Sequence, residues 1–271
     1  MKLVTKFAGP ALLSAAVLVT LFPVYWLATL SLKREVDQFA VPPLWLRFTP
    51  TLAHYHEIFW LRPFGGYLLN SVAAAGFSTL LALIVGTAAA YSLARFPRPG
   101  LAFWILSTRM FPPILSIIPL FLMLRWAGLL NSIAALVVLY TAFNLPFVVW
   151  MMRSFFEELP PDLEEAAMMD GETRLGALWK VVLPLVRPGL AATAAFCLVI
   201  GWNEFLFALI VAQTDAAMTL PVGIAGRVTQ YEIKWGAMSA AGVVAMLPVF
   251  LFASAMQKYL VRGLSLGAVK G

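Results

Sequence analysis

Six long apolar stretches constrain the fold of this chain more than any other feature of its sequence. A helix needs about 20 mostly apolar residues to cross the roughly 30 Å hydrocarbon core of a bilayer. The stretches predict membrane-spanning helices at residues 10–32, 67–93, 101–124, 131–152, 188–213 and 236–257. Arg109 and the pair Pro112-Pro113 interrupt the third span, and Glu204 interrupts the fifth. We therefore expect an all-α membrane protein with six transmembrane helices.

The composition excludes an ordinary soluble domain. Hydrophobic residues make up 62% of the chain and charged residues 12%, with a mean hydropathy of +0.87. Soluble domains are roughly half apolar and about a quarter charged. The net charge is +6, but Lys and Arg lie at the ends of the apolar stretches instead of forming one patch, so no nucleic acid is expected as a partner. The single cysteine, Cys197, excludes an internal disulfide and a multi-cysteine metal site.

The basic residues also predict an orientation. An even number of spans places both termini on the same side of the membrane. With both termini in the cytoplasm, eleven Lys and Arg residues lie in inner segments and seven in outer ones, as the positive-inside rule favours. Lys33 and Arg34, directly after the first span, count against this orientation. We expect one polytopic domain over residues 1–271 in the cytoplasmic membrane, with an uncleaved first helix, because its apolar stretch exceeds that of a signal peptide.

The long inner loop, residues 153–187, predicts two short helices at the inner face of the membrane. In the first, Asp162 is placed to cap the N-terminus, with Glu165 three residues later as in a capping box, and Gly171 ends the helix. The second begins near Thr173, and its apolar face consists of Leu175, Leu178, Val182 and Leu185.

The first loop helix has the features of a helix held in a partner's socket. Ala166 and Ala167 allow a partner backbone to approach, and Glu165 offers a charge that fixes orientation. An amphipathic inner loop is also common in polytopic proteins without such a partner, so these features alone leave both interpretations open.

The same loop carries a specific pattern. Glu165-Ala166-Ala167 is followed by Gly171 after three residues and by Val181-Val182-Leu183-Pro184 after nine more. This pattern resembles the EAA loop of permease subunits in binding-protein-dependent ABC importers, and Asp170 with residues 185–189 is similar to the carbohydrate branch, above all to maltose-type second permease subunits. Shorter similarities lie at 110–112, 119–121, 144–146, 202–204 and 267–271. The resemblance implies the type I ABC importer permease fold.

The resemblance also implies a function and a set of partners. It identifies the chain as a subunit of an importer for a sugar or polyol that works with a second permease subunit, two ATPase subunits and an extracytoplasmic substrate-binding protein. ATP and Mg²⁺ would be bound by the ATPase subunits, and no cofactor or metal by this chain. The sequence contains no Gly-x-x-x-x-Gly-Lys-Ser/Thr phosphate loop, which fits a non-catalytic transport subunit.

Roles for individual residues follow from the same resemblance. The segment that couples to the ATPase subunit would consist of Glu164, Glu165, Ala166, Ala167, Met169, Asp170 and Gly171. The tail that contacts the ATPase subunits would consist of Gly267, Ala268, Val269, Lys270 and Gly271. The outer loop at about 214–235 would contact the substrate-binding protein.

Polar residues inside the spans are candidates for the substrate pathway. They are Arg109, Asn144, Trp202, Asn203 and Glu204. A charge inside the bilayer costs about 2.5 to 3.5 kcal/mol on insertion scales, so Arg109 and Glu204 are expected to face protein or water. Sugars bind amides, carboxylates and aromatic faces, which the neighbours Trp202, Asn203 and Glu204 supply. A snorkelling or structurally paired Arg109, and an Asn203 that joins helices, are the alternatives.

Two other classes of function compete with the importer. An ion-coupled secondary transporter usually has several intramembrane carboxylates and two related halves, whereas only Glu204 lies deep here and no halves match. A membrane enzyme needs a nucleophile with a base, or a metal cluster. Cys197 is expected to be a packing residue, and the spacing of His54 and His56 favours a solvated pair in an outer loop. The secondary transporter is the stronger alternative.

Overall fold

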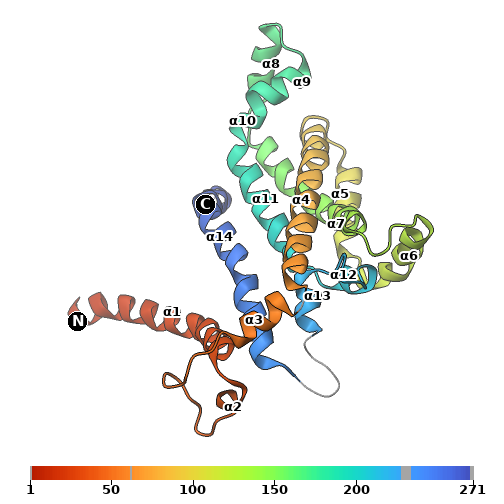
Figure 1. Ribbon diagram of the computed structural model, residues 1–271. Coiled ribbons are helices and arrows are strands. Elements are labelled where there is room, and N and C mark those ends of the chain that lie inside the picture. The colour runs from red at the N-terminus through yellow and green to blue at the C-terminus, as the bar shows by residue number, and fades with distance from the viewer. Residues whose placement is uncertain (1, 62, 227–232, 269–271) are drawn as a thin grey trace. The chain divides into compact units, whose positions relative to one another are not determined.

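The computed structural model describes residues 2–61, 63–226 and 233–268, and over these residues it consists of helices without a strand (Figure 1). Among the described residues, four helices are long and apolar enough to cross a membrane: α1 (Lys2–Leu32), α4 (Phe64–Arg95), α7 (Ile133–Glu157) and α14 (Trp235–Ala268). They match the first, second, fourth and sixth predicted spans.

The third predicted span is a sharply bent pair. Helices α5 (Pro99–Ser107) and η1 (Thr108–Met110) meet α6 (Pro113–Trp126) at 94°. Phe111 at the bend is extended, with a ψ angle of 122°. A residue that precedes proline avoids the helical region, and Pro112 has no N–H to continue the helical hydrogen bonds. The bend therefore follows from the proline pair that interrupts this span.

The fifth predicted span is also broken. Three short helical segments, α9 (Arg174–Ala177), η2 (Leu178–Val182) and α10 (Leu183–Leu185), precede α11 (Arg187–Trp202). The segment 174–185 and α11 meet at an angle of 76°. Helix α11 ends at Trp202, so the predicted continuous span 188–213 divides into α11 and the short α12 (Leu206–Val211). With each bent pair counted as one span, the described residues provide up to six spans.

The described residues group into two compact units. Unit 1 is drawn from residues 1–65 and 223–248, and unit 2 from residues 66–222 and 249–271. Among the described residues, unit 1 contains α1, the first part of α14 and two short helices between the first two spans, α2 (Glu35–Gln38) and α3 (Ala53–Trp60). A further short helix, α13 (Leu220–Ala225), follows α12. Unit 2 contains the candidate functional residues inside the spans and in the loop 153–187.

A buried lysine holds the segment after α1 in unit 1. Lys33 is fully buried, and its Nζ lies 4.3 Å from the centre of the Trp26 ring and 5.4 Å from that of Phe48. Cation–π contacts of this kind stabilise an ammonium group that is out of water. Burial lowers the pKa of Lys33 from its usual value, and the nearby Asp37 carboxylate opposes that shift.

The same part of unit 1 corrects the expectation of two solvated histidines. His54 is buried, and its Nε2 lies 2.9 Å from the Lys33 carbonyl oxygen and 3.1 Å from Gln38 Nε2. Gly236 leaves the space for this ring, because a Cβ there would lie 2.2 Å from His54 Nε2. His56 is exposed as expected.

Helices α4, α7 and α11 pack against one another in unit 2. Val148 and Met152 of α7 pack in one apolar cluster with Cys197 of α11, which is completely buried, as expected for a packing residue. Gly86 of α4 approaches Val148 so closely that a Cβ at this position would lie 2.7 Å from Val148 Cγ1. About three turns earlier on nearly the same face of α4, Ala75 contacts α11, where a Cβ at Gly201 would lie 3.3 Å from the Ala75 Cα.

We expect Gly86→Ala to destabilise unit 2. The added Cβ meets the stiff, branched Val148 side chain, and overpacking of this kind costs about 1 to 3 kcal/mol, against a gain in helix propensity of about 1 kcal/mol. Gly76→Ala is the matched control in the same helix, because nothing lies within 4 Å of a Cβ there. Thermal unfolding of the purified protein in lipid nanodiscs measures the difference. Equal melting temperatures for the two variants contradict the packing argument.

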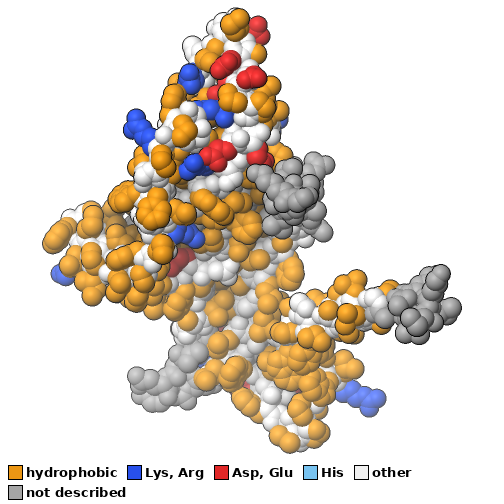
Figure 2. Space-filling view, turned by 180° about the vertical axis from the view of Figure 1, so that it is seen from behind, with side chains coloured by type: hydrophobic (Ala, Val, Ile, Leu, Met, Phe, Trp, Pro, Cys, Tyr) orange, Lys and Arg blue, Asp and Glu red, His pale blue; other side chains and the backbone are white. Residues whose placement is uncertain are grey.

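The visible face of unit 2 divides into an apolar part and a charged end (Figure 2). Hydrophobic side chains such as Phe77, Ile84, Trp104 and Ile118 are exposed on its helices. Charged side chains gather at the end that carries α8 (Asp162–Met169) and α9 (Figures 1 and 2). An apolar belt next to a charged end is the surface expected of a membrane-embedded unit with an aqueous tip.

Candidate functional site

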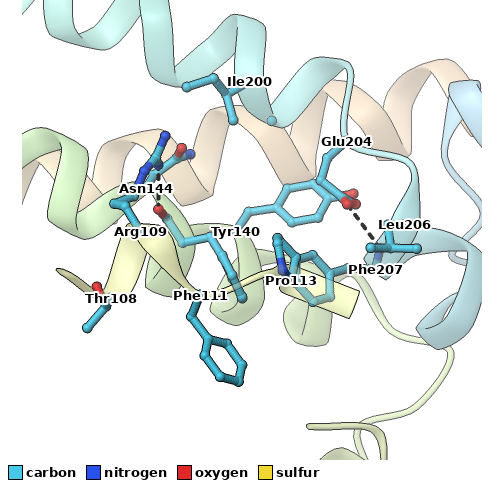
Figure 3. Close-up of a pocket in the computed structure, with 12 residues that line it drawn as sticks. Thr108, Arg109, Phe111, Pro113, Tyr140, Asn144, Ile200, Glu204, Leu206 and Phe207 are labelled. Carbon is cyan, nitrogen blue, oxygen red and sulfur yellow. Dashed lines mark hydrogen bonds between the residues drawn. The ribbon is translucent and has the colours of Figure 1, made fainter. Parts of the chain in front are cut away.

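A cavity of about 310 Å³ opens among η1, α7, α11 and α12 of unit 2 (Figure 3). Three of the five residues that the sequence predicts for the substrate pathway line it: Arg109, Asn144 and Glu204. Its walls also carry the rings of Phe111, Tyr140, Phe143 and Phe207. The cavity thus combines a guanidinium group, an amide and a carboxylate with aromatic faces.

Glu204 lies in the break between α11 and α12 and is held by the helix that follows it. Its two carboxylate oxygens accept hydrogen bonds from the backbone N–H groups of Phe207, at 3.0 Å, and Ala208, at 3.2 Å. The first N–H groups of a helix have no partner within the helix, and the positive end of its dipole favours an anion. The Tyr140 ring extends toward the same carboxylate (Figure 3). The Glu204 side chain is therefore fixed in position by the start of α12.

Arg109 connects η1 to α7. Its Nη1 donates a hydrogen bond to the Phe143 carbonyl oxygen at 3.0 Å, and its guanidinium carbon lies 5.7 Å from the centre of the Phe147 ring. Within the described ranges no carboxylate forms an ion pair with Arg109. The contact with α7 supports the structural role weighed for this arginine, while its guanidinium group also forms part of the cavity wall.

Asn144 is the most unusual polar group in the cavity wall. Only 1% of its surface is exposed, and neither Oδ1 nor Nδ2 has a hydrogen-bond partner among the residues that the structure describes. Buried polar groups nearly always find a partner, and leaving one unsatisfied costs about 1 to 3 kcal/mol. An amide in this position is suited to bind a polar ligand or water in the cavity.

Trp202 and Asn203 do not join Glu204 in one cluster. Trp202 is buried at the end of α11 and does not line the cavity, and Asn203 Nδ2 donates to the Val199 carbonyl oxygen of its own helix at 2.8 Å. Adjacent side chains of a helix point about 100° apart, so three successive residues at the end of α11 do not share one wall. Sequence reasoning missed Tyr140, although its position four residues before Asn144 places both on one face of α7.

Helix α8, which contains most of the residues predicted to couple to an ATPase subunit, has two different faces. Glu164 and Ala167 are buried against the chain's own helices, whereas Glu165, Ala166, Met169 and Asp170 are exposed. Of the predicted coupling residues, four thus lie on the accessible face and two on the inner one. Gly171 ends the helix with a φ angle of +92°, a conformation that glycine adopts without strain.

The predicted capping box of α8 is wrong. Asp162 is the first residue of the helix, Pro161 occupies the N-cap, and no side chain caps it. The Pro161 carbonyl oxygen accepts from the N–H groups of Glu164 and Glu165, because the helical φ of proline starts the helix one residue earlier than expected.

The second loop helix begins as predicted and packs only in part as predicted. Thr173 caps α9, since its Oγ1 accepts from the Gly176 N–H at 3.1 Å. Of the predicted apolar face, Leu178 and Val182 are buried while Leu175 and Leu185 are exposed. The π-helical turn η2 lies between Leu178 and Leu185 and changes the angular spacing of the side chains after Leu178, which separates Leu185 from the predicted face.

The predicted tail and outer loop are described only in part. Gly267 and Ala268 are the last residues of α14. Val269, Lys270 and Gly271, and residues 227–232 of the outer loop, lie outside the described residues.

The sequence of this chain matches the family described as binding-protein-dependent transport system inner membrane component, over residues 78–266. The chain belongs to this permease family. The resemblance of its inner loop to ABC importer permeases is thereby confirmed. The permease is a non-catalytic subunit of a transport system that works with a substrate-binding protein.

Relatives of the permease match along nearly its whole length. It is 40% identical to the sulfoquinovosyl glycerol transport system permease protein SmoH of Agrobacterium fabrum, over 98% of this chain and 95% of that protein. It is 36% identical to the trehalose/maltose transport system permease protein MalG of Thermococcus litoralis, over 94% and 93%. A chain in the crystal structure of a bacterial ABC transporter that imports alginate shares its fold, with a TM-score of 0.78 at 24% identity over 94% of this chain and 96% of that chain.

Proposed function

We propose that the permease is one of two membrane subunits of an ATP-driven importer for a sugar or polyol. It would lie in the bacterial cytoplasmic membrane with both termini in the cytoplasm. The names of the relatives, which refer to sulfoquinovosyl glycerol and to trehalose and maltose, support a carbohydrate substrate. The positive-inside distribution of Lys and Arg supports the orientation.

The cavity supports the same class of substrate. Sugars present hydroxyl groups that both donate and accept hydrogen bonds, and C–H faces that pack on aromatic rings. Asn144 can donate and accept, Arg109 can donate, and Tyr140 and Phe143 offer ring surfaces in the same wall. In this proposal the cavity forms this subunit's share of the translocation pathway, and the second permease subunit supplies the rest.

The accessible face of α8 is the observation that carries the link to ATP. Glu165, Ala166, Met169 and Asp170 are exposed at the end of unit 2 that carries α8 and α9, while Glu164 and Ala167 attach the helix to the permease (Figure 1). In our proposal this face docks into a separate ATPase subunit that binds ATP and Mg²⁺. The tail from Gly267 to Gly271 would contact the pair of ATPase subunits.

Cysteine crosslinking tests the docking. Met169→Cys is expected to crosslink to the ATPase subunit in native membranes, because Met169 is exposed on α8. Ala167→Cys is the matched control on the inner face of the same helix and is expected to give at least tenfold less product. The natural Cys197 is fully buried and adds little background. Absence of an ATPase crosslink from Met169→Cys contradicts the docking.

Uptake measurements separate the importer from the ion-coupled alternative. Proteoliposomes that contain the complete importer, the substrate-loaded binding protein and internal ATP are expected to accumulate substrate after ionophores have removed proton and sodium gradients. Uptake that stops when the gradients are removed, while ATP is maintained, favours the secondary transporter.

A further inference from the structure

A buried ion pair joins α8 to the end of α4. Arg95 Nε lies 2.6 Å from Glu164 Oε1, and the Tyr91 hydroxyl donates to Glu164 Oε2 at 2.6 Å. Arg95 Nη1 also donates to the Phe156 carbonyl oxygen of α7 at 3.0 Å. The side chains of Arg95 and Glu164 are 9% and 5% exposed. One carboxylate and one guanidinium group thus fasten α8 to α4 and α7 together.

This ion pair differs from the others at the same end of unit 2. The side chains of Arg153 and Glu157 are 31% and 46% exposed, and those of Lys180 and Glu172 are 68% and 33% exposed. Exposed pairs contribute little, whereas removal of one partner from a buried pair leaves an uncompensated charge. Loss of one partner of the Arg95–Glu164 pair is therefore expected to cost more than loss of one partner of either exposed pair, and this pair connects α8 to the membrane helices.

Of the two helices that Arg95 connects, α7 lines the cavity and α4 packs against a residue that lines it. On α4, Ala75 packs against Gly201, which lines the cavity, and Ala75 is sixteen residues, or about 24 Å, from Tyr91. On α7, Tyr140 and Asn144 line the cavity wall. A displacement of α8 that moves Glu164 therefore acts on α7, which lines the cavity, and on α4, which contacts the lining residue Gly201.

We propose that Tyr91, Arg95 and Glu164 form the joint that transmits movement of α8 to α4 and α7. They are positioning residues, because they touch neither nucleotide nor transported substrate. The inference rests on the proposed docking of α8 into an ATPase subunit and assigns the inner face of that helix a separate task. In this arrangement the exposed face of α8 binds the ATPase subunit, and the buried Glu164 carboxylate transmits the movement of α8 to the membrane helices.

The test measures uptake per ATP hydrolysed in the complete importer, reconstituted with its ATPase subunits and binding protein. For Arg95→Ala and for Glu164→Ala, we expect this ratio to fall at least tenfold while the complex stays assembled. The double variant is expected to fall no further than either single one, because both residues act in one joint. Arg153→Ala combined with Glu157→Ala removes an exposed Arg–Glu pair from α7 and is expected to keep the original ratio.

A milder variant keeps the inference testable when the alanine variants fail to assemble. Tyr91→Phe preserves the buried ring and removes only the hydrogen bond to Glu164, and we expect about a threefold lower ratio. An unchanged ratio in Tyr91→Phe, or in an assembled alanine variant, overturns the joint.

Crosslinking through Met169→Cys separates this inference from the proposed docking. In the Arg95 and Glu164 variants, a retained ATPase crosslink together with a lowered ratio supports the joint. A crosslink that is lost only in these variants overturns it, because the cluster then only holds α8 in position for docking. A crosslink that is missing with Arg95 and Glu164 intact contradicts the docking itself.

Discussion

Replacement of Glu165 by alanine is expected to abolish substrate uptake while the permease stays folded in the membrane. The Glu165 side chain is exposed on α8, and no ion pair to it occurs in the described part of the chain. Its removal therefore costs the fold little. In the proposed docking this carboxylate becomes buried against a partner, and truncation of one member of a buried charged contact costs about 2 to 5 kcal/mol. That corresponds to a roughly 30-fold to 4,000-fold weaker contact.

Uptake of labelled substrate, together with the amount of permease in the membrane, measures this effect. Glu158→Ala is a suitable control, because Glu158 is an exposed carboxylate that follows α7 and lies outside α8. We expect the control to transport normally. Normal uptake by Glu165→Ala at a normal level of permease removes Glu165 from the coupling contact.

The contrast between Glu164 and Glu165 shows what sequence reasoning can and cannot assign. Both carboxylates belong to the same recognisable loop, so the pattern predicts a short helix and a shared role for them. Adjacent residues on a helix point about 100° apart, and which of them faces inward depends on partners far away in the sequence. Glu164 faces inward because it binds Arg95 and Tyr91, which lie 69 and 73 residues earlier in the chain. The sequence of the loop does not indicate these partners.

The membrane helices likewise differ in how far the sequence predicts them. Hydropathy predicts α1, α4, α7 and α14 well, because the length of an apolar stretch is fixed by the thickness of the bilayer. It also indicates where the third and fifth spans break, through Pro112 and Glu204. It does not predict the direction of the chain after each break, which separates Trp202 and Asn203 from the cavity and brings Arg109 to it. Contacts between elements distant in sequence set these directions.

Asn144→Leu is the second substitution with a large expected effect, and it separates transport from stability. In the structure the buried Asn144 amide has no hydrogen-bond partner within the described residues. Its removal therefore relieves the free-energy cost of burying an unpaired polar group, which is about 1 to 3 kcal/mol. We expect the melting temperature of the purified permease to stay the same or rise. Uptake is expected to fall at least tenfold, because the cavity wall loses the group that can both donate to and accept from a sugar hydroxyl.

Thr87→Val provides the matched control for Asn144→Leu. Thr87 lies on α4, away from the residues that line the cavity, and its buried hydroxyl likewise has no partner in the described ranges. Its replacement relieves a cost of the same kind without a change in the cavity, so uptake is expected to be preserved and the melting temperature to stay the same or rise. If Asn144→Leu unfolds at a lower temperature and also loses uptake, Asn144 is a structural group that joins helices. If it transports normally, the substrate does not contact this wall, because an apolar side chain cannot replace the hydrogen bonds of the amide.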